Sequence, residues 1–298
     1  MTIVHHEELT TVPPPDAGPL LPADPSRPAG GARGPGLKSR SLALAVATGW
    51  AALGGAVLVA IWALAASRAP NLPTPSEALA AARELFADPF YDNGPNDKGI
   101  ALLLLMSVQR VFIGFAMAAV VAIPLGLLIG GSRRAWMAAN PLVQLLRPVS
   151  PLAWFPIGLA ALSDVPNALV FMIFVISLWP MVINAAAGAA SVPSDHRNVA
   201  KVFHFGRLAY VRHVMLPHSL PAIVTGMRLS MGYAWMVIVA GEMLAGSSGV
   251  GGFVWQSYNA GDVVKVVAAI LPIGLVGLII DIAFLRLGRK VALEEVHS

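Results

Sequence analysis

Long runs of residues without a charge are the feature that most constrains the fold of this chain. Residues 41–66 and 111–131 carry no charged side chain, and about 20 apolar residues are enough for a helix to cross a bilayer. Only 12% of all residues are charged, whereas a soluble domain carries about 25%. The sequence therefore predicts an all-α, polytopic membrane protein.

Six apolar runs predict six transmembrane helices. The first run is longer than the 7–15-residue core of a signal peptide, so we expect it to be retained. The third run is interrupted by several prolines and is expected to be a broken span. The six runs are residues 41–66, 111–131, 135–162, 166–190, 219–244 and 263–285.

The lysines and arginines set the expected orientation, because short cytoplasmic loops carry an excess of them. With the N-terminus in the cytoplasm, most of the 20 Lys and Arg residues fall on the cytoplasmic side. Both termini are therefore expected to be cytoplasmic. Residues 1–40 are rich in proline and glycine without an apolar period, which predicts a disordered tail.

A capping box is predicted in the external loop between the first two spans. Thr74 and Glu77 have the spacing of that motif, and Pro75 suits the first helical position. A short amphipathic helix should follow, with Leu79, Ala82 and Phe86 on one face.

A basic stretch, NVAKVFHFGRLAYVRHVMLP (residues 198–217), lies between two spans. Val199, Val202 and Phe203 recur at helical spacing. Gly206 can allow a turn, and Pro217 is expected to end a second short helix. The second apolar stripe consists of Leu208, Val211, Met215 and Leu216.

Two interpretations of this stretch remain open from its residues. It is either a cytoplasmic loop whose apolar stripes lie in the lipid interface, or a docking element for a cytoplasmic partner. In the second case Val202 and Phe203 would be the apolar anchors and the basic residues the rim.

Charged residues inside spans are functional candidates, because they are costly in lipid. Arg147 and Arg228 can line a path for an anion or can serve in salt bridges. Glu242 is expected to pair with an arginine or a backbone amide, and Arg110 to be structural. Asp281 is expected to pair with Arg286 or with a neighbouring helix.

The basic stretch resembles the cytoplasmic loop of ABC-importer permeases, whose pattern is Glu-Ala-Ala, a glycine, and then a hydrophobic residue, any residue, Leu-Pro. Gly206, Leu216 and Pro217 match that pattern, whereas Asn198 and Val199 replace its glutamate and first alanine. Residues 107–130 and 145–162 are similar to spans of the nitrate, sulfonate and taurine branch. Residues 234–261 are most like the nitrate/cyanate/bicarbonate-type subgroup.

This resemblance implies a type I ABC-importer permease fold in a bacterial cell membrane. It also implies import of a small oxyanion, with nitrate expected, delivered by an external solute-binding protein. Two cytoplasmic subunits would bind the ATP, and a second permease, expected to be an identical chain, would complete the pathway. The chain itself is expected to hold no cofactor, no metal and no catalytic residue, and to contact membrane lipid but no nucleic acid.

The sequence yields two sets of candidate site residues. The resemblance, together with the apolar spacing of the loop, gives the candidate ATPase-coupling residues Asn198, Val199, Ala200, Val202, Phe203, Gly206, Leu216 and Pro217, and the charges inside spans give the candidate translocation-path residues Arg147, Arg228 and Glu242. The expected regions are a disordered cytoplasmic tail (1–40), a first transmembrane helix (41–66), an external loop with a short helix (67–105), a permease core (106–287) containing a cytoplasmic coupling loop (191–217), and a cytoplasmic tail (288–298).

Other functions are less consistent with the sequence. No Gly-x-x-x-x-Gly-Lys motif followed by Ser or Thr occurs, so ATP binding by that route is not expected. A sulfonate or taurine permease is the nearest alternative. An ATP-independent secondary transporter or channel is a more distant one, because no internal repeat is evident. The glycine-rich residues 246–252 are expected to form a flexible outer lip that meets the binding protein, or else to lie beside an aromatic belt.

Overall fold

The computed structural model describes residues 37–69, 71–94 and 97–297, and most of them are helical. Within these ranges there is no β-strand, only one isolated bridge between Asp92 and Lys98. The α-helices are α1 (Leu37–Arg68), α2 (Pro75–Leu85), α3 (Ile100–Gly130), α4 (Arg133–Leu146), α5 (Trp154–Leu162), α6 (Val165–Ala190), α7 (Ser194–Val202), α8 (Arg207–Tyr210), α9 (Leu216–Ala245), α10 (Val250–Asn259) and α11 (Val263–His297). A 3₁₀-helix, η1 (Pro151–Ala153), precedes α5, and a π-helix, η2 (Val211–Met215), precedes α9.

The chain divides into two units, residues 1–58 and 59–298. The described part of the first unit, residues 37–58, is a single helical segment of α1. Residues 1–36 of the predicted disordered tail lie outside the described residues. The second unit contains all the remaining helices.

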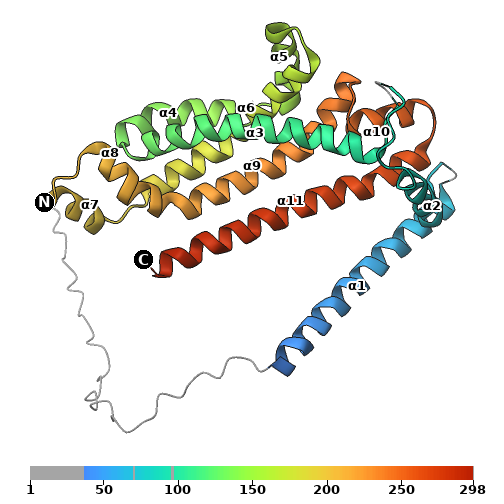
Figure 1. The fold of residues 1–298 in the computed structure, drawn as a ribbon, viewed down its shortest axis with the longest axis horizontal. Coiled ribbons are helices and arrows are strands. Elements are labelled where there is room, and N and C mark those ends of the chain that lie inside the picture. The colour runs from blue at the N-terminus through green and yellow to red at the C-terminus, as the bar shows by residue number, and fades with distance from the viewer. Residues whose placement is uncertain (1–36, 70, 95–96, 298) are drawn as a thin grey trace, which may run out of the picture. The chain divides into compact units, whose positions relative to one another are not determined.

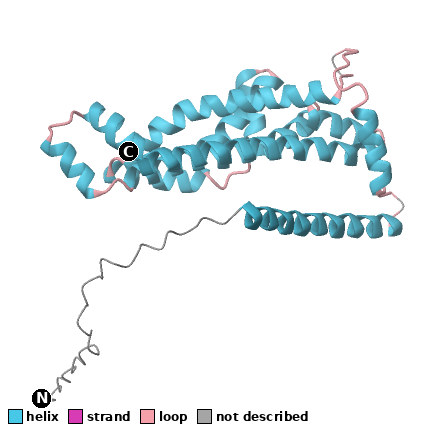
Figure 2. Cartoon of the chain, turned by 60° about the horizontal axis from the view of Figure 1, so that its bottom comes forward, coloured by secondary structure: helices cyan, strands magenta, loops and turns pink. Residues whose placement is uncertain are grey.

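Helices α3, α6 and α9 form the centre of the second unit and lie side by side (Figures 1 and 2). The core between them contains fully buried Val111, Met172, Met231 and Ile238. A Cβ atom at Gly126 would lie against the backbone of α6, so α3 and α6 approach each other closely there. Small residues at such crossings are typical of helix packing in membranes.

Within the described residues, five helices are long and apolar enough to cross a membrane, and a sixth crossing results if one bent pair counts as a span. That pair consists of α4 and residues 151–162, which meet at 88°. Pro148 and Pro151 at the bend have no N–H group, so the helical hydrogen-bond pattern cannot continue through it. The predicted break in the third apolar run is confirmed.

Three predicted region boundaries differ from the observed helices. Helix α1 begins at Leu37, inside the expected disordered tail. Helix α3 begins at Ile100, inside the expected external loop, because residues 100–106 are apolar and lengthen the helix at its N-terminal end. Helix α11 continues to His297, although a tail was expected from residue 288. No proline follows Pro272, so nothing in the sequence breaks the helix.

The predicted capping box of α2 is confirmed. The Thr74 N–H donates to Glu77 Oε2 at 2.8 Å, and the Thr74 hydroxyl oxygen accepts from the Glu77 N–H. The first of these bonds is the main cause of a lowered pKa of the Glu77 carboxyl.

The buried face of α2 is built from alanines rather than from the predicted larger residues. Ala81 and Ala82 pack against Ala268 of α11. Leu79 and Phe86 are exposed. The small side chains allow α2 and α11 to lie close together.

Candidate functional site

An exposed apolar surface lies on α7 and the turn that follows it. The side chains of Val202, Phe203 and Leu208 are 72%, 69% and 81% exposed. Phe205 and Val199 extend the apolar surface. Both α7 and α8 lie at one end of the second unit, beyond the ends of α3, α6 and α9 (Figure 1). A projecting surface with this much exposed apolar area is typical of protein or membrane contact.

The chain turns at His204 rather than at Gly206. His204 has φ 54°, in the left-handed region, and the Phe205 N–H closes the turn on the Ala200 carbonyl. Gly206 has an ordinary φ of −63° and begins α8. A Cβ atom at Gly206 would meet no atom within 4 Å. This glycine is therefore not needed for the backbone of the isolated chain.

The second predicted stripe packs inside the protein, except for Leu208. Met215 is buried, and Val211 and Leu216 pack with it against Leu127 of α3 and residues of α6. This packing fixes the base of the loop to the spans, so the first stripe and Leu208 remain exposed.

The prediction that Pro217 ends the second short helix is wrong. Helices α8, η2 and α9 form one continuous stretch from Arg207 to Ala245. Pro217 lies near the start of α9, directly after the π-helix. Such wider turns accommodate a proline ring that would otherwise clash with the carbonyl four residues earlier.

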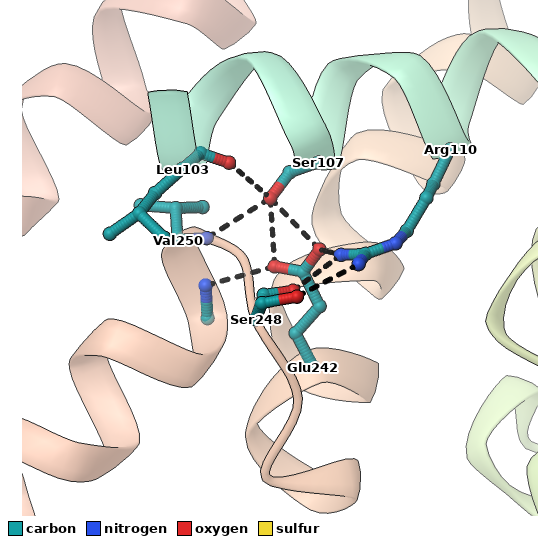
Figure 3. A network of polar contacts seen from close by, with 7 residues as sticks. Leu103, Ser107, Arg110, Glu242, Ser248 and Val250 are labelled. Carbon is teal, nitrogen blue, oxygen red and sulfur yellow. Dashed lines mark hydrogen bonds and ion pairs between the residues drawn. The ribbon is translucent and has the colours of Figure 1, made fainter. Parts of the chain in front are cut away.

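A buried polar network lies at the opposite end of α9 (Figure 3). Glu242 has no exposed surface. Its carboxylate accepts from Arg110 Nη1 at 2.7 Å, from the Ser107 hydroxyl at 2.8 Å and from the Gly251 N–H at 3.0 Å. Both partners predicted for Glu242, an arginine and a backbone amide, are therefore confirmed.

The same network holds the glycine-rich turn before α10. Arg110 Nη1 also donates to the Ser248 carbonyl, and the Val250 N–H donates to the Ser107 hydroxyl oxygen at 3.1 Å. Gly249 has φ 137°, which favours glycine, and a Cβ atom there would overlap the Glu242 carboxylate. The expected flexible lip is instead a turn whose backbone is bonded to a buried ion pair.

Arg228 forms a bidentate ion pair with Asp281. Arg228 Nε and Nη2 donate to the two carboxylate oxygens at 2.7 and 3.0 Å. This pair joins α9 to α11, so the prediction that Asp281 pairs with a neighbouring helix is confirmed. The pair borders a cavity of about 420 Å³ that is otherwise lined mainly by apolar side chains such as Trp235 and Phe284.

Arg147 lies at the bend between α4 and η1 and lines a different cavity, of about 360 Å³. Among the described residues its side chain has no acidic partner and no hydrogen bond, unlike the side chains of Arg110 and Arg228. The three predicted path residues thus occupy three separate places. In this conformation the fully buried Glu242 lines no open path.

Several residues of these sites were missed from the sequence. Ser107 and Ser248 have no distinctive motif, and Arg110 is 132 residues from Glu242. Tyr233 and Trp179, which line the Arg147 cavity, resemble ordinary interface aromatics in the sequence. The only available signal for the network was an acidic residue inside an apolar run.

Comparisons with known proteins agree with this arrangement. The family model described as "Binding-protein-dependent transport system inner membrane component" matches residues 122–293. The chain is 42% identical over 234 residues to the nitrate import permease protein NrtB of Synechocystis sp., covering 78% of this chain and 85% of the relative. It is 39% identical over 225 residues to the bicarbonate transport system permease protein CmpB of Synechococcus elongatus, covering 74% of this chain and 81% of the relative.

A solved structure has the same fold at low sequence identity. It is described as inward-facing conformations of the MetNI methionine ABC transporter, and the match has a TM-score of 0.58 at 16% identity. The match covers 64% of this chain and 95% of the other. This likeness supports the fold alone.

Proposed function

The chain belongs to the family of binding-protein-dependent transport system inner membrane components, and from that premise we propose that it is the permease subunit of an ATP-driven importer of nitrate. Its fold is that of a type I ABC-importer permease. The observation that carries the substrate assignment is the 42% identity to a nitrate import permease over most of both chains.

Bicarbonate is the second candidate substrate. The 39% identity to bicarbonate permeases is only slightly lower than the identity to nitrate permeases. Both ions are small, planar, singly charged oxyanions, so one pathway chemistry suits either. The external solute-binding protein of the complex would select between them.

The surface formed by Val199, Val202, Phe203, Phe205 and Leu208 is the proposed docking site for a cytoplasmic ATP-binding subunit. Its large exposed side chains can fill a cleft on that partner, and Lys201 and other basic residues can form the rim. The open space around Gly206 supports close approach of a partner backbone. Asn198 and Ala200 lie on α7 in the same segment, while Leu216 and Pro217 anchor it to α9.

ATP would be bound and hydrolysed by the partner subunits, and this chain would change its packing in response. Two permease chains, which we propose to be identical, would enclose the pathway. The α7–α8 end and both termini would be cytoplasmic, and the turn before α10 would face the external binding protein. The excess of lysine and arginine at the α7–α8 end supports this orientation.

Reconstitution of the whole transporter tests the proposal. The permease, its ATP-binding subunit and the binding protein are placed in proteoliposomes, and uptake of nitrate and of bicarbonate is measured with and without ATP. We expect ATP-dependent nitrate uptake that exceeds bicarbonate uptake. Uptake without ATP would favour a secondary transporter, and uptake of taurine alone would favour the sulfonate branch.

A variant tests the docking site directly. Val202→Asp with Phe203→Asp places two charges on the proposed apolar anchors, and the ATP-binding subunit should no longer co-purify. Leu79→Asp is the matched control, since Leu79 is also an exposed apolar residue but lies on α2. Equal retention of the ATP-binding subunit by both proteins would contradict the assignment.

A further inference from the structure

The cavity beside Arg147 is a recess on the surface of the spans, where the side chains of Arg147 and Tyr233 are exposed. It is bordered by the bend after α4, by α6 around Pro180 and by α9 around Tyr233. Pro180 is ten residues before the end of α6 at Ala190, about 15 Å along the helix at 1.5 Å per residue. That distance is about half the thickness of the hydrocarbon layer, which is about 30 Å. The cavity is therefore near the middle of the membrane.

The polar groups that line this cavity are mainly hydrogen-bond donors, and most of these donors have no acceptor partner among the residues that the structure describes. Arg147, the Trp179 indole N–H and the Tyr233 hydroxyl have no partner in the described part of the chain. The Asn184 amide donates one N–H to the Pro180 carbonyl at 2.8 Å, which leaves its second N–H available. None of the lining residues is acidic.

The remaining lining residues are apolar and include Ile176, Ile183 and Val237. Apolar walls lower the local dielectric and strengthen hydrogen bonds to an ion beside them. The volume of about 360 Å³ lies within the range of about 300–1,000 Å³ typical of small-molecule sites.

We propose that this cavity is an anion-binding site within the spans, with Arg147 as its charged group and Trp179, Tyr233 and Asn184 as further donors. Its ligand is a small planar oxyanion, because a guanidinium group can donate two parallel hydrogen bonds to such an ion. The identification of that ion as nitrate rests on the proposed function, whereas the site itself rests on the unpaired donors.

Within the described ranges, Arg147 has no carboxylate partner, unlike the other two arginines of the spans. Arg110 and Arg228 each pair with a carboxylate, which cancels their charge. An unpaired arginine in the middle of a membrane is costly, and an anion that enters the cavity supplies the missing acceptor. The lining of the cavity carries one positive charge and would repel a cation.

Binding is measured on the full chain in nanodiscs of zwitterionic lipid. Sodium nitrate is titrated, with sodium gluconate holding the ionic strength constant, and the unfolding temperature is followed by tryptophan fluorescence. A ligand that binds only the folded state stabilises it by RT ln(1 + [L]/Kd), so the unfolding temperature rises with the logarithm of the nitrate concentration once that concentration exceeds Kd. The Kd for nitrate fitted from this rise should increase about 10- to 100-fold in Arg147→Gln, as expected for loss of a charge-assisted hydrogen bond.

Further variants keep the test decisive if Arg147→Gln folds poorly. Arg147→Lys keeps the charge but not the paired geometry and should weaken binding less. Tyr233→Phe removes one donor and should weaken it by up to about tenfold. Arg134→Gln is the matched control, because Arg134 lies on α4, the helix that ends just before Arg147, but does not line the cavity.

The outcomes separate this site from the proposed function. Nitrate stabilisation that is absent, or unchanged in Arg147→Gln and Tyr233→Phe, overturns the site even if the complete transporter imports nitrate. Arg147-dependent stabilisation supports the site even if ATP-dependent uptake fails. If anionic phosphatidylglycerol discs stabilise the protein through Arg147 and abolish the nitrate effect, a lipid phosphate is the ligand and the proposal is wrong.

Discussion

Replacing Glu242 with glutamine should destabilise the protein more than any other single charge-neutralising substitution described above. Gln keeps the size of the side chain but removes the charge that faces Arg110. Its amide group would also bring an N–H donor toward three existing donors, namely the Ser107 hydroxyl, the Gly251 N–H and the Arg110 guanidinium.

The magnitude follows from the burial of the pair. The side chains of Arg110 and Glu242 are 10% and 0% exposed, so solvent offers little compensation. Breaking a buried ion pair by removing one partner costs about 3–5 kcal/mol. Because Arg110 still donates to the Ser248 carbonyl, we expect the lower end of this range, about 3 kcal/mol. For a chain of this size that corresponds to a decrease in unfolding temperature of roughly 6–12 °C.

The assay is thermal unfolding of the purified protein in zwitterionic nanodiscs. The matched control is Asp262→Asn, which removes the charged partner of Lys265 in an ion pair whose side chains are 50% and 34% exposed. Exposed pairs contribute about 0–1 kcal/mol, so the control should shift the unfolding temperature by less than about 4 °C.

A double substitution tests the coupling itself. Arg110→Gln together with Glu242→Gln leaves no unpaired buried charge and should cost less than the sum of the two single changes, by about 0.5–3 kcal/mol. If Glu242→Gln behaves like Asp262→Asn, or if the two costs simply add, the argument from buried charge is refuted.

Three further predictions concern the loop, the outer turn and the second ion pair. Gly206→Asp should leave the unfolding temperature of the isolated chain unchanged, because no atom lies near its Cβ, but should abolish ATP-dependent uptake; normal uptake would contradict the docking site. Gly249→Ala should lower the unfolding temperature, since strained backbone costs about 1–3 kcal/mol and the new methyl group overlaps Glu242; an unchanged unfolding temperature would refute this. Arg228→Asp and Asp281→Arg should each reduce uptake. If the ion pair is structural, the double variant with both substitutions should recover part of the uptake. No recovery would indicate that uptake requires an arginine at position 228 itself.

Sequence signals that involve only neighbouring residues predicted the fold well. Apolar runs identified the spans, prolines identified the bend after α4, and Thr74 with Glu77 identified the start of α2. Each of these signals depends on neighbouring residues, for which the physical rule is local. The boundary of α3 was less accurate, because an apolar run does not indicate where the helix leaves the membrane.

The functional residues were predicted less completely, because they depend on pairing between distant helices. Glu242 was expected to find an arginine, but its identity as Arg110 requires knowledge of how α3 packs against α9. The same is true of Arg228 and Asp281, which are 53 residues apart. Arg147 was selected for its proline-rich surroundings, whereas the donors around it became evident only from the cavity. The role expected for Gly206 in turning the chain was wrong, because His204 adopts the left-handed conformation.

The unbroken stretch from Arg207 to Ala245 has a mechanical consequence. Its 39 residues correspond to about 58 Å at 1.5 Å per residue, nearly twice the thickness of the hydrocarbon layer. A tilt of about 5° at one end of a straight helix of that length moves the other end by about 5 Å. In the proposed importer, motion of the α7–α8 end would therefore reach the Glu242 ion pair at the opposite end of the stretch, and the π-helix η2 with Pro217 is the place where the stretch can bend.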